Sequence, residues 1–255
     1  MFRGVKHSLL LDRAVPNDYI MKANAVGAGK FNIEHISLWI PKNIPSLEIQ
    51  TEIEAKLVSG YIKNLYFEQV RVYRTMFQPT ETSPTWIITT LPGSEIPKHI
   101  FIAFQSSERL PAAKPQNINN MIFDNGNLKR ISVRVNSVQY PEREIECNFT
   151  EANRNYRRTY MMFLEAVNKY QDTDTGCQLS AEDWASLYPI HHFDVSKHSE
   201  RLKKSMADIE VKFILGGKFR NIANNADVPY YVYAVVLSDR YMQLQGLSGK
   251  MNVIV

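Results

Sequence analysis

The chain has 255 residues, of which 44% are hydrophobic and 11% aromatic, enough for one large domain or one domain with an appendage. Its 13 tyrosines and 12 phenylalanines favour strands over helices. The net charge of +4 is too small to argue for nucleic acid as a partner. Two cysteines, Cys147 and Cys177, are too few for a disulfide scaffold, so we expect reduced thiols.

The sequence predicts neither a secretory leader nor a membrane span. The apolar run Leu9–Leu11 is too short for a signal peptide, and Asp12 interrupts it. The longest apolar run, Tyr230–Leu237, is far shorter than the roughly 20 residues of a membrane helix and indicates a buried strand. We therefore expect a protein that is not secreted and does not enter a membrane.

Residues 31–58 are expected to form a strand followed by a helix. Apolar side chains recur along Phe31–Ile40 in the manner of a strand, and a bulge would explain where the apolar side switches. Ser46 suits the N-cap of a helix, and Ser59-Gly60 suits its end. One face of this helix would carry an apolar stripe with a four-residue spacing, formed by Ile49, Ile53 and Leu57.

Most of the chain after Gly60 shows the two-residue period of β-strands separated by turns. Pro92-Gly93 indicates a turn, and Gln105–Asn119 is rich in Pro, Ser and Asn, which predicts a loop. The expected strands are Ile62–Arg74, Trp86–Leu91, His99–Phe104, Ile118–Phe123, Lys129–Tyr140, Ile145–Phe149, Ile209–Leu215, Tyr230–Leu237, Tyr241–Leu244 and Met251–Val255.

The clearest strand signal lies in Leu128–Pro141. Apolar and polar side chains alternate there, with Ile131, Val133 and Val135 on one side. Asn125-Gly126 precedes this run, and both residue types tolerate the positive φ of a tight hairpin turn. We therefore expect Ile118–Phe123 and Lys129–Tyr140 to pair antiparallel across that turn.

Two helices are predicted within the β region. Asn155–Tyr170 has a helical period, and Ser180–Asp183 resembles a capping box that opens a short helix to Leu187. The apolar face of the first would consist of Tyr156, Tyr160, Phe163, Leu164, Val167 and Tyr170. Short helices between strands predict a mainly β fold, an antiparallel jelly-roll barrel or sandwich with inserted short helices, rather than an immunoglobulin-type sandwich.

One stretch, HHFDVSKH, combines residue types that bind metals: His191, His192, Asp194 and His198. On a strand, His192 and Asp194 would share a face. A metal site needs three or four converging ligands, and the His-x-His of cupin-type enzymes with a Glu shortly after it is absent. We therefore interpret the histidines as a structural pair at the start of a strand and predict no metal.

The sequence contains no motif for catalysis. It lacks Gly-x-Ser-x-Gly and the glycine-rich phosphate-binding loops, and neither cysteine lies in a known catalytic motif. We predict that the protein is not an enzyme and has no catalytic, cofactor-binding or metal-binding residue and no cofactor.

Basic side chains form two clusters, Arg154, Arg157 and Arg158 in the first and Arg201, Lys203 and Lys204 in the second. They could contact nucleic acid or an acidic neighbour, or they could be a solvated helix face and a charged loop. No pattern of stacking aromatic residues accompanies them, so we favour the second interpretation and expect at most weak contact with nucleic acid.

Several segments occur in an order that is similar to a known family. They are Ile96–Gln105, Phe123–Pro141, the helix around Tyr156–Tyr170, His192–Lys197, Ile209–Leu215 and Val235–Val255. The chain resembles the double jelly-roll capsid-like proteins of Polinton/Maverick elements and related viruses. Asn136-Ser137 with Tyr140-Pro141 fits the family's N-S-x-x-Y-P strand, and Asp239-Arg240 fits its C-terminal D-R strand.

The resemblance implies a structural subunit that acts by self-assembly, with homotrimers and other capsid subunits as partners. It implies a location in the virion, or otherwise in the host cell interior. Family members are about two jelly rolls long. Residues 1–58 would then be a lead-in, the remnant of a first jelly roll with a strand and a linker helix, and residues 59–255 a jelly-roll domain. We expect self-association through residues 31–58 and a more monomeric barrel without residues 1–58.

The alternative is a jelly roll that binds a carbohydrate or another ligand, with Trp86, Trp184 and the many tyrosines as stacking surfaces. A flat apolar flank on the barrel would favour assembly, whereas a concave aromatic pocket would favour a ligand. A third hypothesis, a cupin-like enzyme, would require a stoichiometric metal.

Overall fold

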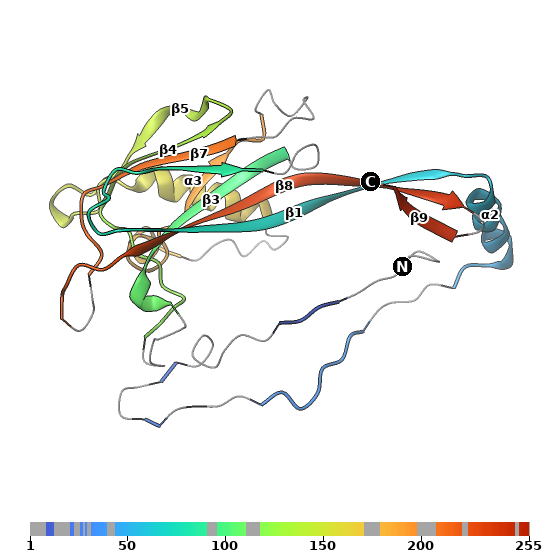
Figure 1. The fold of residues 1–255 in the computed structure, drawn as a ribbon, viewed down its shortest axis with the longest axis horizontal. Helices are drawn as coiled ribbons and strands as arrows, with labels where there is room; N and C mark the ends of the chain where they lie inside the picture. Colours follow the sequence, from blue (N-terminus) through green and yellow to red (C-terminus); the bar gives the residue numbers. More distant parts are fainter. Residues whose placement is uncertain are drawn as a thin grey trace.

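Two antiparallel sheets face each other in the computed structural model, and three α-helices lie outside them in the part of the chain that it describes (Figure 1). The described residues are 9–12, 21–22, 26–27, 29, 32–39, 44–90, 96–110, 118–170, 179–197, 208–220, 224–247 and 250–254. The mainly β prediction is confirmed.

The strand order within each sheet is that of an eight-stranded jelly roll. The first sheet has the order β1 (Ile62–Phe77), β8 (Tyr230–Leu247), β3 (Ile96–Ser106) and β6 (His191–Asp194), and β9 (Lys250–Ile254) also pairs with β8. The second sheet has the order β2 (Thr85–Thr89), β7 (Asp208–Leu215), β4 (Leu128–Val135) and β5 (Val138–Glu146). Every described pairing between these strands is antiparallel.

The main core lies between the two sheets. The alternation predicted for β7 is present, because Ile209, Val211 and Phe213 are fully buried. β3 contributes Phe104 from the opposite sheet, and its ring meets that of Phe213 edge to face with centroids 4.9 Å apart. Since apolar side chains from both inner faces interdigitate here, this layer holds the barrel together.

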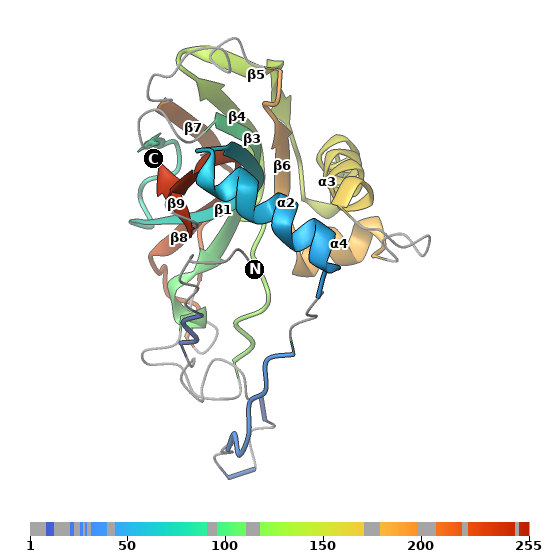
Figure 2. The same cartoon turned by 90° about the vertical axis from the view of Figure 1, so that its right-hand side faces the viewer.

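β1 and β8 extend well beyond the barrel. They pair along all 16 residues of β1 without a register shift, from Ile62 opposite Gln245 to Phe77 opposite Tyr230. Their far ends form a ribbon with β9, and α2 (Leu47–Val58) lies across its tip (Figures 1 and 2). The predicted helix end is confirmed, with Gly60 at a positive φ of 77°.

The other two helices also agree with the sequence. α3 comprises Arg157–Tyr170 and α4 comprises Ala181–Leu187. The Ser180 hydroxyl oxygen accepts a hydrogen bond from the Asp183 backbone N–H, which confirms the capping box. Two short 3-10 helices, Ser107–Arg109 and Glu151–Asn153, lie in connections.

The predicted hairpin is wrong. β4 pairs with β5 across Asn136-Ser137, both of which have positive φ, and residues 118–123 form no strand. Gly126 does have a positive φ of 54°, but its turn leads into β4 and not between two paired strands. Residues 118–124 instead tie other elements together, because the Phe123 N–H donates to the Leu187 carbonyl of α4.

The strand predicted for Phe31–Ile40 is also absent. Residues 32–39 have an extended or irregular backbone with no strand partner, and all their side chains are exposed. The alternating pattern is a preference for a half-buried pleated surface, and these exposed side chains are not packed on one.

Smaller differences concern strand limits. The segments Tyr230–Leu237 and Tyr241–Leu244 belong to one strand, β8, and β5 runs through Pro141, which follows a cis peptide bond. The runs near Trp86 and His99 lie in different sheets, and Pro92-Gly93 lies outside the described residues.

Candidate interaction surface

The outer face of the first sheet is the surface turned away from the core. The strand register places Val72, Val235, Phe101 and His192 in one row across β1, β8, β3 and β6. Because side chains alternate along a strand, the even-numbered residues of β1 share this face with Val72.

Helix α3 covers the part of this face that lies over β6 (Figure 2). The His192 Nδ1 donates to the Met162 carbonyl of α3 at 3.0 Å, since a carbonyl can only accept. Trp184 of α4 is fully buried beneath α3, with its ring 5.8 Å from that of Tyr160 and 6.3 Å from that of Phe163. The two helices therefore form one packed layer on one half of the face.

The predicted apolar face of α3 is rotated from the observed one. Tyr156, which directly precedes the helix, is buried as predicted. Among the side chains of α3 that the structure describes, Thr159 and Ala166 are buried, whereas Phe163, Leu164 and Val167 are half-buried. Small side chains allow close approach to β6, and the larger ones lie at the margin of the contact.

The other half of the outer face is open. Five apolar side chains of β1 are exposed on this face, one of them Ile62 at the start of the strand. We call the other four, with Val72 at 64%, the open flank: Tyr66, Val70, Val72 and Met76. β1 is also the edge strand of its sheet, and β8 is the one described strand that pairs with it. Apolar surface on an edge strand is a site for association.

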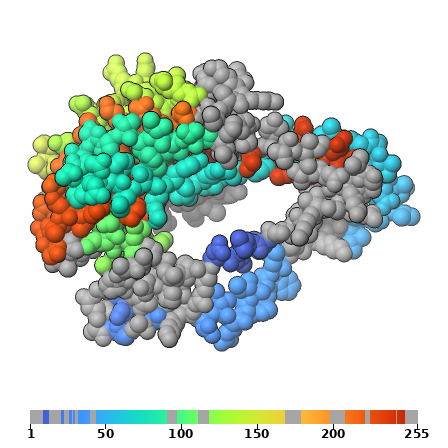
Figure 3. Space-filling view, viewed as in Figure 1, coloured from blue at the N-terminus to red at the C-terminus, as the bar shows by residue number. Residues whose placement is uncertain are grey.

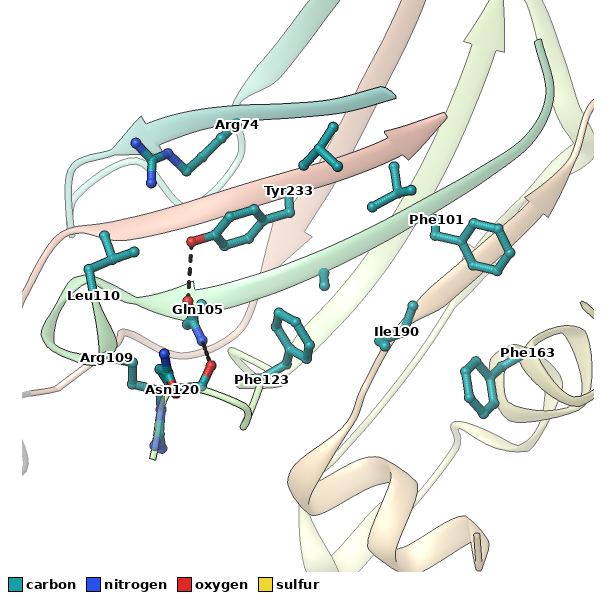
Figure 4. Close-up of a pocket in the computed structure, with 13 residues that line it drawn as sticks. Arg74, Phe101, Gln105, Arg109, Leu110, Asn120, Phe123, Phe163, Ile190 and Tyr233 are labelled. Atoms are coloured by element: carbon teal, nitrogen blue, oxygen red, sulfur yellow. Dashed lines mark hydrogen bonds between the residues drawn. The ribbon is translucent and has the colours of Figure 1, made fainter. Parts of the chain in front are cut away.

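A pocket of about 690 Å³ lies where the open flank meets α3 (Figure 4). Its aromatic lining consists of Phe101, Phe123, Phe163 and Tyr233. Several polar groups beside it are engaged within the protein, whereas the side-chain oxygen of Asn120 has no hydrogen-bond partner among the described residues. The Gln105 side-chain nitrogen donates to the Asn120 and Ile122 carbonyls at 2.8 and 3.0 Å, and the Tyr233 hydroxyl donates to the Gln105 side-chain oxygen. The pocket wall therefore offers mainly apolar surface.

Charged groups join the strands beside the open flank. The Lys98 ammonium of β3 lies 3.0 Å from a Glu68 oxygen of β1 and 3.0 Å from an Asp239 oxygen of β8. Burial by itself would lower the pKa of Lys98, but its hydrogen bonds to both carboxylates raise that pKa above its ordinary value.

The histidine cluster lies on β6, where His192 and Asp194 share a face as predicted. They line a small cavity of about 200 Å³ beside Glu165 of α3. His99 of β3, which the sequence did not indicate, has its Nδ1 3.0 Å from the His192 Nε2. Only the strand register reveals this neighbour, because 93 residues separate the two histidines.

Within the described part of the chain, no group of three or more His, Cys, Asp or Glu residues could hold a metal. His198 lies outside the described residues. The interpretation of the histidines as a structural group stays a prediction.

The remaining candidates are placed as follows. Arg154 pairs with Glu182 at 3.2 Å, and Arg157 and Arg158 are exposed on α3. Cys147 is buried, and burial raises the pKa of its thiol to about 11. Outside the described residues are Arg201, Lys203, Lys204 and Cys177.

Neither tryptophan named for stacking presents a free ring. Trp184 is fully buried, so that part of the ligand-binding prediction is wrong for this residue. Trp86 is half-buried and packs against the main core.

A profile of the double jelly roll-like domain matches residues 2–242. The chain belongs to the double jelly roll-like family. This confirms the resemblance at the level of the family. None of the curated proteins compared with this double jelly roll-like chain matches it. No helix in the described residues is long and apolar enough to cross a membrane.

Solved structures similar to this double jelly roll-like chain include three from viruses. The mavirus major capsid protein has a TM-score of 0.36 at 13% identity, and the match covers 83% of this chain and 44% of that one. The PBCV-1 virus capsid has a TM-score of 0.37 at 12% identity, and the match covers 77% of this chain and 52% of that one. The Sputnik virophage structure has a TM-score of 0.39 at 10% identity, and the match covers 75% of this chain and 39% of that one. The chain thus spans about half or less of the length of these proteins.

Proposed function

We propose that this protein is a capsid-like structural subunit that works by packing against copies of itself and against other capsid subunits. The open flank carries the proposal, because a jelly roll that covers half of a sheet face with its own helices leaves the other half apolar and exposed. Membership of the double jelly roll-like family supports the same role.

In finer detail, the proposal includes homotrimers and a location in the virion, both of which follow from the resemblance to virus-like capsid proteins. It treats residues 1–58 as a lead-in, the remnant of a first jelly roll, and residues 59–255 as the assembling domain. No residue in this role performs catalysis, so the working parts are the barrel flank and the loops.

Self-assembly is tested by replacing one residue of the open flank in the full chain. Sedimentation velocity over a range of concentrations should show that the wild-type chain forms oligomers and that Val72→Glu shifts it towards monomer. A charge on this flank would have to lose water in the contact, which opposes association.

The matched control is Ile87→Lys. Ile87 is 64% exposed, as is Val72, but it lies on β2 in the other sheet, opposite Glu210, which accommodates a cation. This variant should associate like the wild type. A wild-type chain that remains monomeric at every concentration would contradict the proposal, as would equal loss of association in both variants.

One observation favours the alternative of ligand binding, namely the concave aromatic pocket of about 690 Å³, a size typical of ligand sites. A sugar needs several free hydrogen-bonding partners, and Gln105 and Tyr233 of this pocket are engaged within the protein, which argues against a sugar. Saturable binding of a soluble glycan to a monomeric chain, abolished by Phe123→Ala, would establish this alternative in place of assembly.

A further inference from the structure

The residues along β1 are arranged so that the strand is complementary to itself. On its outer face, the open flank alternates with charged residues in the order Tyr66, Glu68, Val70, Val72, Arg74 and Met76. An antiparallel copy of the same strand reads this order in reverse. The residues that then lie opposite each other can be read from the sequence for any chosen centre of symmetry.

One centre of symmetry, Arg71, matches the outer-face residues from Tyr66 to Met76. It also places the two Arg71 side chains opposite each other on the inner face, where their like charges oppose the contact. Val70 of one copy would lie opposite Val72 of the second, Glu68 opposite Arg74, and Tyr66 opposite Met76. Each of these pairs is favourable across neighbouring strands: an aliphatic pair, an ion pair, and an aromatic ring with a methionine. Because the axis is two-fold, each pair occurs twice.

The edge of β1 is available for such pairing. β8 is the one described strand that hydrogen-bonds β1, and it occupies a single edge over the full 16 residues. Figure 3 shows the teal atoms of β1 bordering a hollow, with the blue atoms of the N-terminal segment on its far side. Residues 32–39 form no strand, so they do not pair with this edge.

We propose that two copies of this chain associate through their β1 strands, antiparallel and centred on Arg71, so that the first sheets of both copies form one continuous sheet. This deepens the proposed function, on which it rests, by naming the contact. A two-fold contact of this kind can join two subunits or link two larger assemblies. It covers the open flank with the same surface of a second copy.

Charge reversal tests the ion pair across the axis. Glu68→Lys and Arg74→Glu should each weaken self-association of the full chain by about tenfold or more in Kd. Because Glu68 also pairs with Lys98 and Arg74 lies over the Tyr231 ring within one copy, the double variant is the decisive test. The double variant Glu68→Lys/Arg74→Glu should restore the affinity. Within one copy the two residues are six positions apart on a strand, about 20 Å, so the rescue has to occur between copies.

Cysteine cross-linking tests the register. In a Cys177→Ser background, Val70→Cys and Val72→Cys chains should each remain uncrosslinked alone under mild oxidation and form a covalent dimer when mixed. This asymmetric requirement follows from Val70 facing Val72 of the second copy. Ile87→Cys mixed with either variant is the control and should remain uncrosslinked.

The outcomes separate this contact from the general proposal. If the wild-type chain self-associates but the double variant is not rescued, or either cysteine variant cross-links alone as well as in the mixture, the β1 contact is overturned and self-assembly stands. If the wild-type chain stays monomeric, both are overturned.

Discussion

His191 is enclosed by aromatic rings at the start of β6. It is fully buried, its ring centroid is 5.6 Å from that of Trp184 and 6.1 Å from that of Phe104, and neither ring nitrogen has a hydrogen-bond partner among the described residues. Burial lowers its pKa from 6.5 to about 3. The ring therefore remains neutral in the folded protein under conditions in which an exposed histidine would be protonated.

This pKa shift predicts an acid-sensitive fold. Below pH 6.5 the unfolded chain binds a proton at His191 that the folded chain does not, so stability present above pH 6.5 is lost as the pH falls towards 3. One such group contributes up to about 1.4 kcal/mol per pH unit. His191→Phe replaces the imidazole with an aromatic ring that does not titrate. Its thermal unfolding midpoint should therefore fall less between pH 7 and pH 4 than that of the wild type, as measured by thermal scans.

The control for this prediction is His35→Gln, because His35 is exposed. It should leave the pH dependence as in the wild type. Other titratable groups remain in both proteins, so His191→Phe should reduce the slope and not abolish it. Equal slopes in wild type and His191→Phe would show that this ring does not control acid stability.

For Gly126 the sequence predicted the positive φ correctly, but not that its turn leads into β4 instead of joining two paired strands. Its φ is 54°, and a Cβ there would lie 2.8 Å from the Phe219 ring and 3.1 Å from Leu215. Gly126→Val should therefore lose at least about 2 kcal/mol of stability in urea unfolding, from backbone strain and overpacking together.

Gly60→Val is its matched control. Gly60 has a φ of 77°, but the nearest atom to a Cβ is 4.0 Å away, so this variant carries the strain without the overlap. If Gly126→Val is as stable as Gly60→Val, the packing against Phe219 is not as described.

At the scale of elements, α3 shows why the buried face predicted from hydrophobicity can differ from the observed one by a rotation about the helix axis. The pattern selects large apolar residues, whereas the side of the helix that is most deeply buried carries Thr159 and Ala166. The larger Phe163 lies at the edge, between Trp184 and the pocket.

This arrangement predicts unequal costs of truncation. Trp184→Ala should lose about 3–5 kcal/mol, because a fully buried ring leaves a cavity. Phe163→Ala should lose about 1–2 kcal/mol, since half-burial gives part of the transfer energy. Equilibrium denaturation of both variants measures this. Equal losses would mean that Phe163 is part of the core after all.

The positions of turns and sheet edges were harder to predict from the sequence than the strands themselves. Local turn chemistry is present at both Asn125-Gly126 and Asn136-Ser137, and the choice between them depends on which flanking residues find a sheet. The alternation in β7 and the capping box at Ser180 were readable because both depend on neighbouring residues alone. The pairing of His99 with His192 depends on the strand order, which no local pattern contains. The same holds for the edge of β1 that pairs with none of the described strands.

At the scale of the whole molecule, the main core draws none of the described residues of the lead-in, residues 1–58. Its buried members all lie between Ile88 and Val236, and Leu57 of α2 belongs to a separate small cluster with Leu244. Deleting residues 1–58 should therefore leave a barrel that unfolds cooperatively in circular dichroism. A chain without a cooperative transition would show that the lead-in is an integral layer of the domain.

The same deletion separates two surfaces for self-association. The sequence pattern places self-association in residues 31–58, whereas the two-fold contact proposed above places it on β1. Light scattering on the deletion variant should still detect a dimer if β1 is the contact. A strictly monomeric barrel would instead indicate that self-association occurs through the lead-in.

The unbroken pairing of β1 with β8 also restricts how the gene can change in length. Side chains alternate between the two faces, so an insertion of one codon within β1 would exchange core and outer residues on one side of the insertion. An insertion of two codons would keep both faces. Over these 16 positions, lineages of this protein should therefore gain or lose residues in even numbers, while odd-length changes accumulate in the connections.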